Sequence, residues 1–344
     1  MRLSRTLPAL LLAGLVLLGS CGPTEAADGA EANLRSGEEV VQSDGPYLLV
    51  VNKSSNTLSV INPETGTEVK VIETGFAPHE VAVSQDGRFA YVTDYGTGGQ
   101  PGNTVTVVDM GAMEVSGTIS LALHTRPHGV AVASDGTLWV TTEGSAHVLH
   151  VDPESGKILQ AVETGQNVTH MVAVAEEAGR VVTANIGSGT ATIVDPATQS
   201  VIAHVETGAG AEGLTVHPDG QLAYVTNRAA GTLVELDLAT GAVSRSMDVG
   251  DFPIRVKVRP GGKELLVSNA NGNEVVAVDP DEWTILRRLP VGAAPIGILV
   301  TPDNKTAYVA NTQDDKITVI DLVNWEVSGE IFPGKEPDGM AWVG

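Results

Sequence analysis

A repeat of 42 residues covers most of this chain and limits what it can fold into. Residues 218–237 show the unit: an Asp-Gly turn, a strand ending in Tyr-Val-Thr-Asn, a short polar loop and a second alternating strand closed by Asp. The position of that Asn recurs seven times, at Asn52, Asp94, Thr142, Asn185, Asn227, Asn269 and Asn311. An anchor position before the preceding strand recurs every 42 residues after a first interval of 49, at Pro78, Pro127, Thr169, Ala211, Pro253, Pro295 and Pro337.

Each repeat contains four short β-rich segments, for example 79–83, 89–93, 104–108 and 115–120. Four short strands in a period near 42 fit one blade of a β-propeller. The chain starts with the second strand of a unit, at 48–52, and ends with a lone first strand, at 338–343. We therefore predict an all-β, seven-bladed propeller over residues 46–344, closed by one C-terminal strand that joins three N-terminal strands.

The repeat also carries a family resemblance. Residues 91–94, 224–227 and 308–311, with Pro-x-x-Val-x-Val before them and Val-Ile-Asp after them, resemble the YVTN repeat of bacterial and archaeal β-propellers. The resemblance extends from Tyr47 to the end of the chain and implies the propeller fold. That family includes surface, periplasmic and cofactor-handling members, so the resemblance implies no single activity.

The first 20 residues have the features of a signal peptide. Two arginines precede an apolar run at 7–18, which is too short to span a bilayer. Residues 18–21, Leu-Gly-Ser-Cys, resemble a bacterial lipobox, which implies that Cys21 is acylated and anchors the protein to a lipid bilayer. Residues 21–45 are rich in Ala, Glu, Gly and Ser, and we predict that they form a disordered acidic tether.

These features predict an exported lipoprotein of the cell envelope. Gly22, rather than Asp, follows the cysteine, which by resemblance favours the outer membrane in a bacterium with two membranes, on its periplasmic side or at the surface. The alternative is an ordinary secretory signal with an incidental cysteine.

The chain is strongly acidic, with a formal charge of −22 that becomes −24 without residues 1–20. This charge repels nucleic-acid backbones and anionic lipid headgroups, and 4% aromatic residues provide few surfaces for base stacking. We therefore expect no nucleic-acid partner. Solubility of an exported protein explains the acidity without a cationic partner.

The residue after each anchor position is predicted to lie at the mouth of the central channel. In order round the ring, these residues are His79, His128, His170, Glu212, Ile254, Ile296 and Asp338. Three adjacent blades thus offer imidazoles with carboxylates on either side, and His124 and His147 are weaker candidates on the same face. Imidazole and carboxylate ligands suit copper, zinc or iron, so we predict a metal or cofactor site. The alternative is that each histidine only hydrogen-bonds a neighbouring loop.

Two further features belong to the same face. We call it the top face, because the loops before each first strand and between second and third strands meet there. Arg255, beside Ile254, is a candidate for binding an anionic ligand, although it could instead pair with an acid between blades. The Gly-rich insertion at 96–103 is predicted to be a flexible loop suited to a rim or lid.

These observations favour a protein that binds a metal, cofactor, small ligand or envelope protein over an enzyme. The enzyme alternative rests on local resemblances: residues 76–92 resemble propeller lactonases, and residues 135–143 resemble the repeat of streptogramin lyases. In such enzymes, His and carboxylate groups at the channel mouth supply base, acid or metal ligand. A tetrapyrrole-binding propeller, similar to that of dissimilatory nitrite reductases, is a third alternative.

Overall fold

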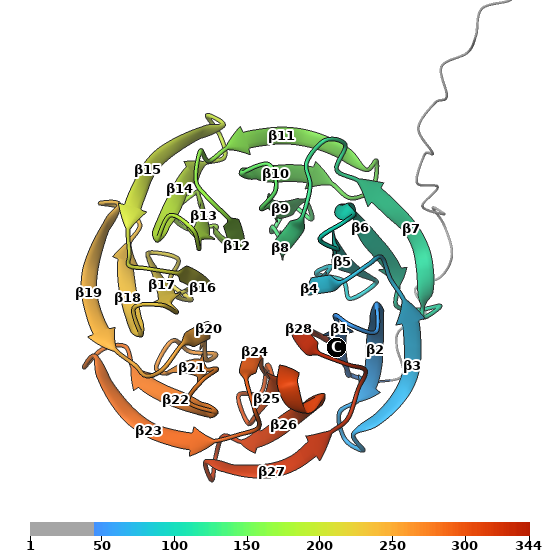
Figure 1. The fold of residues 1–344 in the computed structure, drawn as a ribbon, viewed down its shortest axis with the longest axis vertical. Helices are drawn as coiled ribbons and strands as arrows, with labels where there is room; N and C mark the ends of the chain where they lie inside the picture. The colour runs from blue at the N-terminus through green and yellow to red at the C-terminus, as the bar shows by residue number, and fades with distance from the viewer. Residues whose placement is uncertain (1–44) are drawn as a thin grey trace, which may run out of the picture. The chain divides into compact units, whose positions relative to one another are not determined.

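The computed structural model describes residues 45–344, so the predicted signal peptide (1–20), Cys21 and all but the last residue of the predicted tether (21–45) lie outside the described residues. Strands β1 to β28 form seven four-stranded antiparallel sheets, arranged as blades around a central channel (Figure 1). The predicted seven-bladed propeller is therefore confirmed. In this part of the chain the only helical element is a 3-10 turn at Thr312–Asp314, and no helix there is long and apolar enough to cross a membrane.

Each blade is built outward from the channel. The innermost strands are β4 (Pro78–Val83), β8 (Pro127–Val132), β12 (Thr169–Ala175), β16 (Ala211–Val216), β20 (Pro253–Val258), β24 (Pro295–Val300) and β28 (Pro337–Val343). The second strands are β5 (Phe89–Gly96), β9 (Leu138–Thr142), β13 (Arg180–Asn185), β17 (Leu222–Asn227), β21 (Leu265–Asn269), β25 (Thr306–Asn311) and β1 (Tyr47–Asn52). The third strands are β6 (Pro101–Asp109), β10 (His147–Asp152), β14 (Thr190–Asp195), β18 (Thr232–Asp237), β22 (Glu274–Asp279), β26 (Lys316–Asp321) and β2 (Thr57–Asn62). The outermost strands are β7 (Glu114–Ser120), β11 (Lys157–Glu163), β15 (Ser200–Glu206), β19 (Ala242–Asp248), β23 (Thr284–Pro290), β27 (Glu326–Ile331) and β3 (Thr67–Glu73).

The ring closes between β28 and β1, as predicted. The pairing is antiparallel, with Leu48 opposite Trp342 and Leu49 opposite Ala341, and it completes the sheet β28-β1-β2-β3. One C-terminal strand thus joins three N-terminal strands, so the first blade has a hydrogen-bonded strand on its channel side.

The apolar core is divided among the seven interfaces between adjacent blades. Seven clusters of buried side chains occur among residues 45–344, and each combines two neighbouring blades. For example, Leu49 and Val60 of one blade pack with Val81 and Val92 of the next. Because both faces of each blade are covered in this way, the second strands are almost continuously buried, whereas the outermost strands are mostly exposed and in β23 alternate between exposed and less exposed residues.

The insertion at 96–103 differs from its prediction. Instead of a separate flexible loop, it lengthens the hairpin of β5 and β6, in which Gly96 pairs with Pro101. Thr97 and Gln100 close the hairpin with a backbone hydrogen bond of 2.8 Å. The segment lies on the top face, as expected, because it connects a second strand to a third.

Candidate functional site

The innermost strands bring all seven predicted positions to one place. His79, His128, His170, Glu212, Ile254, Ile296 and Asp338 line a single cavity of about 470 Å³. Arg255 lines the same cavity. The sequence-based placement of these side chains at one mouth of the channel therefore agrees with the structure, and most of them are buried.

A second set of side chains completes the wall of the cavity. Each member directly follows the recurring Asn position at the end of a second strand, and the set comprises Lys53, Tyr95, Glu143, Ile186, Arg228 and Ala270. These residues escaped the sequence-based prediction as a group. The repeat nevertheless contained the signal, because they occupy the same position in six consecutive units.

One repeated backbone hydrogen bond holds the two sets together. The residue before each innermost strand has a left-handed conformation, as in Arg126 (φ 57°) and Val168 (φ 58°). In five blades its carbonyl accepts a hydrogen bond from a residue of the second set; for example, Glu143 N donates to Arg126 O and Ile186 N donates to Val168 O, both at 3.0 Å. This backbone turn places the side chains of both sets at the channel mouth.

The three cavity histidines lie in a row across adjacent blades. The ring centroids are 4.7 Å apart for His79 and His128 and 3.6 Å apart for His128 and His170. Tyr95 extends the row, with its ring 4.4 Å from that of His79. Such close imidazoles repel one another when charged, so the arrangement favours neutral rings.

Burial and hydrogen bonding set the state of His79 and His128. Burial lowers the pKa of His79, although Asp338 opposes this shift. The Nδ1 atom of His79 lies 2.8 Å from the carbonyl oxygen of Ala77, which can only accept, so the neutral ring has its lone pair on Nε2. Burial and the nearby His170 and His79 hold the pKa of His128 well below its ordinary value. The buried Nδ1 of His128 has no hydrogen-bond partner.

Glu143 connects its own blade to both neighbouring blades of this row. Its carboxylate accepts hydrogen bonds of 2.5 Å from His170 Nδ1 and from the Tyr95 hydroxyl. Burial raises the pKa of Glu143, but the hydrogen bonds from His170 and Tyr95 outweigh burial, and the pKa is lowered. Burial, with the hydrogen bond to Glu143, raises the pKa of Tyr95 to about 12. Glu143 is therefore ionised while Tyr95 keeps its proton.

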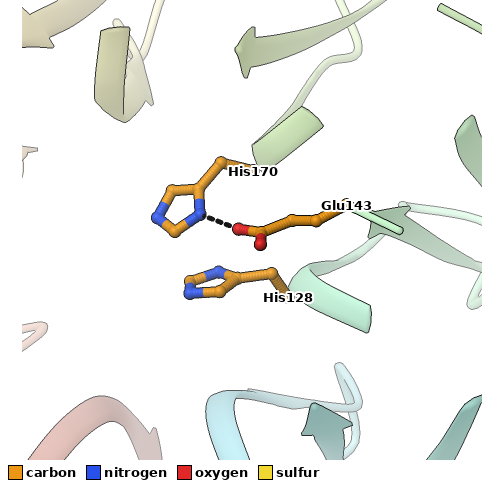
Figure 2. Close-up of side chains that lie close together, drawn as sticks. All are labelled: His128, Glu143 and His170. Atoms are coloured by element: carbon orange, nitrogen blue, oxygen red, sulfur yellow. Dashed lines mark hydrogen bonds and ion pairs between the residues drawn. The ribbon is translucent and has the colours of Figure 1, made fainter. Parts of the chain in front are cut away.

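His128, Glu143 and His170 could together hold a metal ion. Each offers one ligand atom, and these atoms all lie within 4.8 Å of one another (Figure 2). Among residues 45–344 this is the only such group of three or more. Of the predicted ligands, His79, Glu212 and Asp338 lie outside it, although Glu212 Oε1 is 3.7 Å from His170 Nε2.

The cations of the cavity are all paired with acids. Lys53 lies 3.3 Å from Asp338, and Arg228 lies 2.7 Å from Glu212. Arg255, the predicted anion-binding residue, pairs with Glu80, which belongs to a strand on the opposite side of the channel (Figure 1). This buried pair crosses the channel next to the cavity.

The two weaker histidine candidates lie elsewhere on the top face. His124 and His147 contact each other, with ring centroids 4.6 Å apart, but neither lines the cavity. The remaining histidines also have local contacts: His150 stacks on Trp139, His204 contacts Thr192, and His217 contacts Asp219.

The fold and the cavity together define a seven-bladed β-propeller with a polar, histidine-lined site at one end of its channel. Residues 80–295 match the profile of a protein family described as "Phytase-like: Esterase-like activity of phytase". Since this match covers more than half of the chain, the protein belongs to that family.

Known proteins that are similar to this chain include the following three. Virginiamycin B lyase of Nocardia farcinica (strain IFM 10152) is 32% identical over 111 residues, which are 32% of this chain and 39% of the lyase. The alignment thus spans well under two thirds of that relative. The periplasmic gluconolactonase PpgL of Pseudomonas aeruginosa has a TM-score of 0.73 at 18% identity. The match covers 87% of this chain and 99% of the PpgL chain. The dihydro-heme d1 dehydrogenase NirN, in complex with DHE, has a TM-score of 0.62 at 16% identity. The match covers 84% of this chain and 64% of the NirN chain. At these identities the two structures show the shared fold.

Proposed function

We propose that the top-face cavity is an active site that binds a divalent transition metal through His128, Glu143 and His170 and cleaves an ester or lactone bond. The observation that carries this proposal is the unpaired Nδ1 of His128, buried beside two further donors. A buried polar atom without a partner costs about 1–3 kcal/mol. A bound cation would give that nitrogen a partner.

The donors also meet the chemical requirements of a metal site. Metal ligands must be deprotonated, and the lowered pKa values of His128 and Glu143 favour their ligand forms. Two imidazoles and a carboxylate are a donor set suited to zinc, copper or iron. Because His170 Nδ1 now donates to Glu143, binding through that nitrogen would require the ring proton to move to Nε2.

The remaining side chains support acid–base chemistry. A divalent cation at this site would act as a Lewis acid on a carbonyl oxygen. His79, neutral and with its lone pair on Nε2, is suited to accept a proton inside the cavity. The Tyr95 hydroxyl holds the Glu143 carboxylate in place through its hydrogen bond. The esterase wording of the family description and the similarity to a lyase and a lactonase support the same class of reaction.

The cavity wall also indicates the character of the substrate. Each of the three lining cations is already paired with an acid, so none is free to bind a phosphate. Phe252, Ile254 and Ile296 form an apolar part of the wall. We therefore expect an uncharged ester with an apolar portion rather than a polyphosphorylated compound.

Metal analysis and hydrolysis assays on the full chain test this function. We expect near-stoichiometric zinc, copper or iron, together with hydrolysis of aryl esters or small lactones that chelator abolishes. The double variant His128→Ala/His170→Ala should lose the metal and at least about 100-fold in kcat/KM, the usual scale for losing a catalytic group. His204→Ala, on an exposed outer strand, is the matched control. Metal without turnover would leave a binding protein, and neither metal nor turnover would overturn the proposal.

A further inference from the structure

A second pair of histidines lies on the top face outside the cavity. His124 belongs to the loop between β7 and β8, and His147 is the first residue of β10. Their rings meet edge to face with centroids 4.6 Å apart. Both side chains are only partly buried, so ions in solvent can reach them.

Hydrogen bonds around Ser145 fix the protonated nitrogen of each ring. His147 Nδ1 lies 2.5 Å from the carbonyl oxygen of Ser145, which can only accept, so this nitrogen carries the proton. The Thr142 hydroxyl donates to the carbonyl oxygen of His147 at 3.3 Å, so it accepts from the Ser145 hydroxyl at 2.8 Å. The Ser145 oxygen is then left to accept from His124 Nδ1 at 3.2 Å. Both neutral rings therefore carry their lone pairs on Nε2.

A carboxylate extends from the same side of the blade. Glu163, on the outermost strand β11, lies directly opposite His147 in the antiparallel pairing. Side chains directly opposite each other in such a ladder project from the same face, with Cβ atoms about 4.5–5.5 Å apart. Glu163 is exposed, and the donor atoms of His124, His147 and Glu163 do not all lie within 4.8 Å of one another, so the Glu163 side chain must turn toward the rings to join them.

We propose that His124, His147 and Glu163 form a second, solvent-exposed site for a divalent transition metal such as Zn²⁺ or Cu²⁺. We call these three residues the rim site. Two nitrogens bound to one zinc ion lie roughly 3–4 Å apart, because each Zn–N bond is about 2.0–2.1 Å long. The ring centroids are 4.6 Å apart and both Nδ1 atoms contact Ser145, so a shared ion requires the rings to rotate until their Nε2 atoms reach this spacing.

The electrostatics of the pair agree with this assignment. Burial and the neighbouring His147 lower the pKa of His124, which favours the neutral ring that binds metal. Two imidazoles with a carboxylate form a donor set for zinc or copper, and an exposed position leaves room for water ligands. The rim site does not depend on the proposed function of the cavity, because the two sites share no residue.

Zinc titration into the full chain at neutral pH tests the rim site. Wild-type protein should bind one equivalent at the rim in addition to any bound in the cavity. His124→Ala/His147→Ala should lose one equivalent, whereas His128→Ala/His170→Ala should keep the rim equivalent. Glu163→Gln should weaken zinc binding at the rim on the order of tenfold, which corresponds to about 1.4 kcal/mol. Thermal unfolding with chelator present checks that all variants are folded.

Two outcomes would overturn the rim site. One is a rim variant that binds as much zinc as wild type and as the His204→Ala control. The other is a cavity variant, His128→Ala/His170→Ala, that is folded but binds no zinc. The proposed function of the cavity fails by a different result, namely a cavity variant that keeps the full zinc stoichiometry of wild type.

Discussion

At the scale of single residues, a hydrogen bond from Nδ1 leaves the lone pair on Nε2 in two of the three cavity imidazoles. His79 donates through Nδ1 to a carbonyl, and His170 donates through Nδ1 to Glu143. Only His128 has a buried Nδ1 without a partner. The three rings occupy the same position of the repeat, so their different chemistry comes from their surroundings, a backbone carbonyl for His79 and the Glu143 carboxylate for His170.

Asp94 is a second residue whose chemistry depends on the repeat. It occupies the position where five other blades place Asn, and it accepts hydrogen bonds from the backbone of Gly75 and from Thr104 and Thr106. Burial raises the pKa of Asp94 despite these hydrogen bonds. In Asn185, the amide at this position instead donates to the hydroxyls of Thr190 and Thr192.

We predict that Asp94→Asn stabilises the protein at neutral pH by on the order of 1 kcal/mol. Because the pKa of Asp94 is raised in the folded state, the contribution of Asp94 to the free energy of unfolding is most favourable below its ordinary pKa of 3.8. This contribution is lost as pH rises through the folded-state pKa, whereas asparagine does not ionise. Urea unfolding from acidic to neutral pH should show the gain appearing over this window. An equal or lower stability of Asp94→Asn at neutral pH would contradict the prediction.

Sequence reasoning found the first set of cavity residues but not the second. His79, His128 and His170 stood out because they follow a recurring proline or its substitute. Glu143 and Tyr95 stand directly after Thr142 and Asp94, where the Tyr-Val-Thr-Asn pattern has already ended. The position of Glu143 depends on a backbone hydrogen bond to the left-handed Arg126 in another segment, and that contact cannot be read from the residues around Glu143.

At the scale of the strands, a hydroxyl group in the second strand fixes the backbone of the site. Thr141 accepts from Gly129 N at 2.8 Å and donates to the carbonyl oxygen of His170 in the next blade. Thr93 donates in the same way to the carbonyl oxygen of His128, at 2.8 Å. The histidine-bearing strands β8 and β12 are thus each held by the blade before them.

We expect Thr141→Val to weaken the site more than the fold. Valine keeps the shape of the side chain but leaves the buried His170 carbonyl without this donor, at a cost of about 1–2 kcal/mol. Zinc affinity and the free energy of unfolding measure the two effects. Thr226→Val is the matched control, because Thr226 has the same position two blades further on and donates to the carbonyl oxygen of Ile254, which is not a proposed metal ligand. Equal loss of zinc affinity in both variants would contradict this explanation.

The predicted strands agree closely with the structure, because apolar alternation and the recurring turns mark where each strand begins and ends. The insertion at 96–103 is the exception. Its glycines indicated a loop, but Gly96 pairs with Pro101 and the strands β5 and β6 continue into it. The pairing partner, rather than the local composition, decides the conformation of such a segment.

At the scale of the whole molecule, the ring has seven separate interfaces, and the channel is where distant blades meet. Ring closure was predictable because the chain begins and ends within one repeat unit. The contact between Arg255 and Glu80 was not predictable, because the residues are 175 positions apart and lie on blades that share no interface. Both are buried, with Asp338 3.8 Å from the guanidinium and Met171 Sδ 3.0 Å from it.

Breaking this pair should destabilise the entire ring. Arg255→Met would leave Glu80 buried without a counter-ion, which typically costs 3–5 kcal/mol. Burial already raises the pKa of Glu80 against the opposing effect of Arg255, and loss of the arginine would raise it further. A carboxyl group whose pKa is raised in the folded state destabilises the protein increasingly as pH rises from the ordinary pKa of 4.5 to the folded-state pKa. The destabilisation is complete above the folded-state pKa and smallest below 4.5.

The destabilisation of Arg255→Met should therefore be large at mildly alkaline pH and should shrink as pH falls toward the ordinary pKa of glutamate. The double variant Arg255→Met/Glu80→Gln should recover most of the lost stability, because it removes the unpaired charge. Arg245→Met is the matched control, since Arg245 pairs with Glu235 within one blade and is about one third exposed. Urea unfolding of all four proteins at two pH values measures these effects. A pH-independent loss in Arg255→Met, or no recovery in the double variant, would mean that the arginine stabilises the ring through packing rather than through its charge.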